Sequence, residues 1–76
     1  MKPELYTGRV KIISHIGSYY YGIGQLNNSF HICIQKVGDV NWLVKEEEFT
    51  SGDAAKAQIK FIEKEHYDAI KFEASR

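Results

Sequence analysis

The chain has 76 residues, of which 43% are apolar, with one Trp, five Tyr and four Phe and a formal net charge of zero. This composition indicates one small folded domain and excludes a disordered chain. The single cysteine, Cys33, excludes an intrachain disulfide and a multi-cysteine metal cage, and it is typical of a reducing compartment.

Four segments alternate between apolar and polar residues with a period of two, which predicts four β-strands. The segments are joined first by Gly17-Ser18 and then by Asn27-Asn28. Both dipeptides tolerate positive φ, so we expect two-residue hairpin turns there. The predicted strands are Arg9–Ile16, Tyr19–Leu26, Ser29–Lys36 and Val40–Lys45.

The third turn allows two registers. A two-residue loop at Gly38-Asp39 places Ile34 opposite Leu43, whereas a three-residue loop from Val37 to Asp39 places Ile34 opposite Trp42. A slip of one residue moves every side chain to the other face of the strand. We predict the three-residue loop, because it puts the only Trp in the core and sets Ile32 opposite Val44.

A period of 3.6 residues over Ala54–His66 predicts an amphipathic helix that begins near Ser51, with Thr50 as its N-cap and Asp53 as a weak capping-box partner. The fold class is therefore α+β, a four-stranded antiparallel meander with one C-terminal helix packed on one face. The predicted core cluster is Trp42, Ile32, Ile34, Tyr21, Ile12, Ile59 and Ile62.

The last segment, residues 67–74, has two interpretations. Ile70, Phe72 and Ala74 alternate with Lys71 and Glu73, as in a strand. Ala69, Ile70 and Phe72 could extend the helix instead, because a short segment carries too little pattern to decide. Of the two, we favour a short final strand.

The predicted register leaves a second sheet face with no helix over it. Two glycines of the second strand lie on this face, where the missing side chains allow a flat group to approach closely. Together with a row of apolar side chains, they predict a docking surface for a protein; the competing interpretation is an ordinary solvated face. The predicted partner-binding residues of this face are Tyr20, His15, Ile13, His31, Leu43, Gly22 and Gly24.

Charge is unevenly distributed along the chain. Residues 38–53 carry one base and five acids, including Glu46, Glu47 and Glu48, which we predict as the charged flank of the partner-binding surface. Residues 1–37 carry four bases and one acid. Basic side chains near one aromatic side chain predict, as an alternative, a surface that binds single-stranded nucleic acid. Its predicted residues are Arg9, Lys11, Tyr20, Lys56, Lys60 and Lys64.

The sequence offers little for catalysis. His15 and His31 lie on non-adjacent predicted strands, and Cys33 has no histidine directly opposite it. A Glu63-x-x-His66 spacing suits half of a di-metal site, but the chain has no second half. We therefore expect no catalytic residue, no bound metal and no cofactor.

These observations favour a small non-enzymatic binding protein. Domains of this size without a catalytic motif are typical of phage and mobile-element inhibitors that occlude a host macromolecule, anti-CRISPR proteins among them. We expect a protein partner, either a host enzyme or a nucleoprotein complex, and leave open a homodimer. The alternatives are the nucleic-acid-binding module and a small enzyme whose site forms at an oligomer interface. No signal-peptide pattern and no run of about 20 apolar residues is present, so we expect a cytoplasmic protein without membrane contact.

Overall fold

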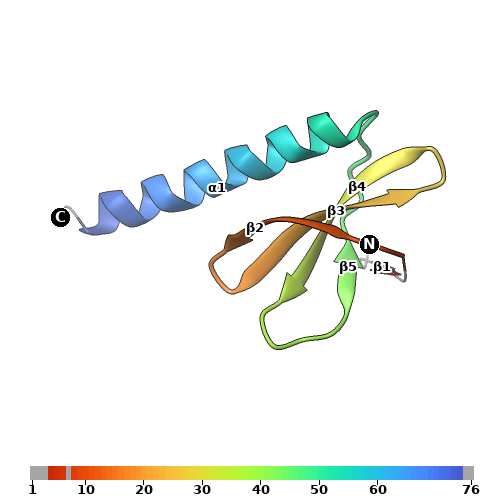
Figure 1. The fold of residues 1–76 in the computed structure, drawn as a ribbon. Helices are drawn as coiled ribbons and strands as arrows, with labels where there is room; N and C mark the ends of the chain where they lie inside the picture. Colours follow the sequence, from red (N-terminus) through yellow and green to blue (C-terminus); the bar gives the residue numbers. More distant parts are fainter. Residues whose placement is uncertain (1–3, 7, 75–76) are drawn as a thin grey trace.

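The computed structural model describes residues 4–6 and 8–74. It has one five-stranded antiparallel sheet and one long helix that crosses it (Figure 1). The elements are β1 (Glu4–Tyr6), β2 (Lys11–Ile16), β3 (Tyr19–Leu26), β4 (Ser29–Lys36), β5 (Trp42–Val44) and α1 (Gly52–Ala74). The predicted α+β class is confirmed, and the predicted meander is β2 to β5. The strand β1, which the sequence pattern did not reveal, pairs with β5 and completes the order β1-β5-β4-β3-β2.

The first two hairpins form as predicted. Ile16 pairs with Tyr19 and Leu26 pairs with Ser29, so each loop has two residues. Gly17 and Asn27 adopt φ values of 61° and 56°, the left-handed conformation that such turns need.

The predicted register of the third hairpin is wrong. Ile34 pairs with Leu43 and Cys33 pairs with Val44, which is the register of the shorter loop. Trp42 therefore lies on the face of the sheet opposite Ile34, where it is half-buried rather than in the core. Burial did not decide the register, because the second face of the sheet also buries apolar side chains.

An irregularity in β2 changes which isoleucine enters the core. The pairing with β3 shifts between Ile12 and Ser14, so Ile13 is an extra residue in the strand. Ile13 packs against the core, whereas Ile12 is 57% exposed. The prediction that Ile12 is buried and Ile13 is on the open face is therefore wrong on both counts.

The core lies between α1 and one face of the sheet. Its centre is formed by buried side chains from β2, β4 and α1, which are Ile16, Ile32, Ala55 and Ile59. Around them pack Ile13, Tyr21, Ile23, Ile34, Phe49 and Ile62. Five of the seven predicted core residues are in this set; the two errors are Trp42 and Ile12.

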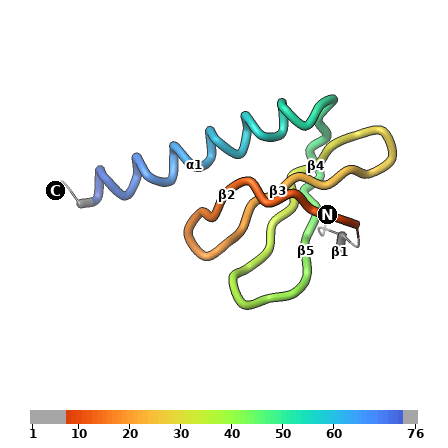
Figure 2. Tube along the Cα trace, viewed as in Figure 1, coloured from red at the N-terminus to blue at the C-terminus, as the bar shows by residue number. Residues whose placement is uncertain are grey.

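The N-cap of the helix lies one residue later than predicted, and the helix extends further at its other end. Ser51, not Thr50, is the N-cap, since its Oγ accepts a hydrogen bond from the backbone N of Ala54 at 3.1 Å. The tail continues the helix to Ala74, so the predicted final strand is wrong. Figure 2 shows this end of α1 projecting past the sheet, and residues 67–73 on it are exposed.

Ser14 of β2 forms a polar contact between helix and sheet. Its Oγ donates a hydrogen bond to the Glu63 carboxylate, which also pairs with Lys60 at 3.8 Å. Ser14 is buried and Glu63 half-buried, so this contact gives a buried hydroxyl a charged acceptor and helps orient α1 on the sheet.

Candidate binding surfaces

The predicted docking face is only partly open. Tyr20 pairs with Gln35, and Gly22 with Cys33, as predicted. However, Gly22, Gly24 and His31 are buried, the last with 7% of its surface exposed. The prediction of an exposed face at these three residues is wrong.

The chain that leads into β2 explains why this face is closed at Gly22. At Gly22 a Cβ would lie 2.4 Å from Cγ1 of Val10 and 2.8 Å from the backbone oxygen of Lys11. The space that the glycine leaves is thus filled by the chain itself and is not open to a partner.

Two other predicted residues of this face point elsewhere. Ile13 packs into the core because of the bulge, and Leu43 shares the face of Ile34 because of the hairpin register. What remains accessible is His15, which is exposed, and Tyr20, which is half-buried. Their ring centroids are 4.8 Å apart with an interplanar angle of 36°, so they form one small aromatic surface at the β2–β3 hairpin.

The buried histidine and cysteine have structural surroundings. His31 Nδ1 donates to the backbone oxygen of Lys45 at 2.9 Å. Burial raises the pKa of the Cys33 thiol from 9.0 to about 11, partly offset by a backbone hydrogen bond from Gly24. A thiol with this pKa is protonated at neutral pH and is a poor nucleophile. Neither residue has the surroundings of a catalytic group.

We expect Cys33→Ala to flatten the alkaline limb of the stability curve. The folded thiol holds its proton to a higher pH than the unfolded thiol. Below about pH 9 the thiol is protonated in both states, so there it does not make the free energy of unfolding depend on pH. Between about pH 9 and about pH 11 only the unfolded thiol loses its proton, so the free energy of unfolding of the wild type falls by about 1.4 kcal/mol per pH unit. Urea unfolding of both proteins at several pH values measures the difference. Parallel stability curves would show that the thiol pKa is not raised.

The three glutamates of the predicted acidic flank lie on a short exposed loop between two fixed points on β4. Before the loop, the Lys45 backbone N donates to Ile32 O at 2.9 Å. After it, Phe49 and Phe30 exchange backbone hydrogen bonds of 2.8 and 2.9 Å. Between these points lie the exposed residues Glu46, Glu47 and Glu48, here called the acidic loop. The loop is thus held close to the sheet at both ends while its carboxylates face solvent.

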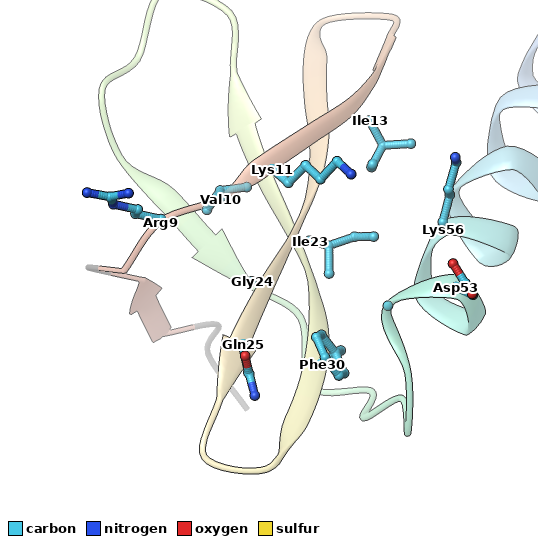
Figure 3. A pocket seen from close by; sticks show the side chains of 11 residues that line it. Arg9, Val10, Lys11, Ile13, Ile23, Gly24, Gln25, Phe30, Asp53 and Lys56 are labelled. Atoms are coloured by element: carbon cyan, nitrogen blue, oxygen red, sulfur yellow. The ribbon is translucent and has the colours of Figure 1, made fainter.

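A groove lies on the other side of Phe30, between the start of α1 and the strands β2 and β3 (Figure 3). It is open to solvent and has a volume of about 670 Å³, within the range of roughly 300–1,000 Å³ typical of ligand pockets. Apolar side chains line its floor, and three basic side chains and one carboxylate line its rim. The rest of the wall is formed by Val10, Gly24, Gln25 and Gly52. The floor residues are Ile13, Ile23 and Phe30, and the rim residues are Arg9, Lys11, Lys56 and Asp53.

The structure brings together three of the residues predicted for nucleic acid and separates the others. Arg9, Lys11 and Lys56 all line the groove. Lys60 and Lys64 lie further along α1, in ion pairs with Glu63 and Asp68. Tyr20 does not line the groove, so the predicted nucleic-acid surface is not one continuous site.

Sequence reasoning did not find the floor of the groove. Ile13 reaches the floor, and Lys11 the rim, because the bulge turns both side chains toward α1, as Figure 3 shows. Phe30 reaches the floor because the helix begins directly beside that ring, where a Cβ on Gly52 would lie 3.9 Å from Phe30. No pattern in the sequence specifies a bulge at that position or the height at which the helix crosses the sheet.

Within residues 4–6 and 8–74, no three His, Cys, Asp or Glu side chains are grouped closely enough to hold a metal ion. Among the same residues, no helix has the length and apolar character to cross a membrane. Comparisons with protein families, with curated proteins and with solved structures found nothing that matches this chain.

Proposed function

We propose that this chain is a non-enzymatic binding protein that occupies a basic surface of a macromolecular partner through the acidic loop. The observation that carries the proposal is the fixation of the loop: three consecutive exposed carboxylates lie between backbone hydrogen bonds to Ile32 and Phe30. A charged segment held in this way loses little conformational entropy on binding. Its charge also steers a basic partner during encounter.

The aromatic pair of His15 and Tyr20 supplies the second element of the proposal. Interface energy concentrates in a few aromatic anchors, whereas charges at the edge mainly set the association rate. Tyr20 is half-buried and its ring lies against that of His15, so little of its side-chain freedom is lost when a partner covers it. The partner class we propose is a host enzyme or nucleoprotein complex with a basic surface. Phage and mobile-element inhibitors, including anti-CRISPR proteins, bind such targets.

Reversal of Glu47 and Glu48 to Lys tests the proposal. Tagged wild type should capture one partner at fixed stoichiometry from cells of the native host, and the reversed variant should capture much less. With the purified partner, we expect association to slow by about tenfold at low salt and to lose its salt dependence. Tyr20→Ala should instead accelerate dissociation, by about 30-fold for a loss of ~2 kcal/mol.

The matched control is Glu65→Lys/Glu73→Lys, the same change of charge at two exposed residues of α1 away from the acidic loop. It should leave both rates near those of the wild type. If the reversed variant binds the partner like the wild type while remaining folded, the acidic loop is not the contact. Turnover of a metabolite by the purified chain would contradict the non-enzymatic assignment.

A further inference from the structure

We propose that the groove between α1 and the β2–β3 edge binds a single-stranded segment of nucleic acid. The proposal concerns a surface that the acidic loop does not use. Three cationic side chains and one carboxylate line the groove, in a chain whose formal net charge is zero. The local excess of positive charge therefore favours an anionic ligand.

The positions of the three basic side chains suit a chain of phosphates better than one isolated anion. Lys11 is the first residue of β2, Arg9 lies two residues before it, and Lys56 comes from the second turn of α1. In Figure 3 Lys56 stands on α1 and Lys11 lies between it and Arg9, whose side chain extends outward on the side away from α1. Charges spread in this way can contact successive phosphates of one strand.

The floor of the groove gives a base an apolar surface to cover. Phe30 is half-buried, and Ile23 and then Ile13 follow it along the groove. A phenyl ring and aliphatic side chains accept the flat face of any base, so this floor provides stacking without base-specific hydrogen bonds. In a duplex that face is covered by the neighbouring base pairs, so the floor fits a single strand and not a double helix.

The measurement is fluorescence anisotropy of the full chain with a labelled oligothymidylate of about ten nucleotides. Three phosphate contacts predict that log K falls with log salt with a slope of about −2 for a single strand. Raising KCl from about 50 to about 200 mM should therefore weaken binding by about 20-fold. The triple variant Arg9→Ala/Lys11→Ala/Lys56→Ala should lose measurable binding, and each single variant should reduce the slope by about 0.7.

Three further variants test the site with effects of different sign. Asp53→Asn removes the carboxylate at the rim and should strengthen binding about twofold to threefold. Phe30→Leu keeps the floor apolar but removes the ring, and it should weaken binding at least fivefold with an unchanged salt slope. Lys36→Ala removes an exposed lysine that does not line the groove, and it should have no effect.

The proposal is overturned if the oligonucleotide does not bind at low salt, or if Lys36→Ala weakens binding as much as Lys56→Ala. Preference for a duplex of the same length, or for a labelled poly-glutamate peptide over the oligonucleotide, would also overturn it. The reversal of Glu47 and Glu48 separates the two proposals, because it should slow partner association without weakening the oligonucleotide complex.

Discussion

Ile59→Ala is expected to destabilise the domain by about 2–5 kcal/mol, the range for removing a large aliphatic side chain from a packed core. Ile59 has no exposed surface and lies at the centre of the cluster between α1 and the sheet. A domain of this size has a total stability of roughly 4–11 kcal/mol, so the loss is a large part of it. The urea midpoint, followed by far-UV circular dichroism, should fall accordingly, with an unchanged slope.

Ile12→Ala is the matched control for this experiment. It removes the same three carbons from a side chain that is 57% exposed, so we expect a change within about 1 kcal/mol. The comparison tests the bulge in β2 as well as the core, because without the bulge Ile12 would be the buried residue. Equal losses for the two variants would show that the strand does not shift its register at Ile13.

Much of the fold follows from local patterns. Alternation located the four strands of the meander, and the turn residues at Gly17 and Asn27 gave the loop lengths that are observed. The period over Ala54–His66 identified the face of α1 that carries Ile59 and Ile62. These features are determined by neighbours in sequence, which is why a single sequence suffices for them.

The errors came from interactions between distant segments. The register of the third hairpin was chosen to bury Trp42, but β4 is covered on both faces, with Ile32 and Cys33 both buried. A strand buried on both faces gives no parity by which to choose between registers. Val10 and Lys11 close the second face at Gly22, and the strand β1 has three residues, too few to give a periodic signal.

The two candidate sites differ in how far the sequence could predict them. The acidic loop is a run of like charges between a strand and a helix, so its exposure could be read directly from the chain. Its fixation could not, because it depends on backbone hydrogen bonds from Lys45 and Phe49 to β4. The groove depends on where α1 begins relative to Phe30, so the sequence alone predicts only its basic side chains.

Gly22→Ala is expected to destabilise the fold by about 1–3 kcal/mol or more, the penalty for forcing atoms into a filled space. A Cβ at this position would lie 2.8 Å from the backbone oxygen of Lys11, which is held in the sheet and cannot move as a side chain can. It would also lie 2.4 Å from Cγ1 of Val10. In an open strand the same substitution would stabilise by about 0.5–1 kcal/mol, so the sign of the change reports the closure of this face.

Gly52→Ala and a double variant make this test decisive. At Gly52 a Cβ would meet only the ring of Phe30 at 3.9 Å, an ordinary contact, so alanine there should be neutral or slightly stabilising. Adding Val10→Ala to Gly22→Ala should recover only part of the loss, because the contact with the Lys11 oxygen remains. Urea midpoints of the four proteins provide the comparison. If Gly22→Ala is as stable as the wild type, the face is open, and Tyr20 would then stand at the edge of the wide docking surface that the sequence first predicted.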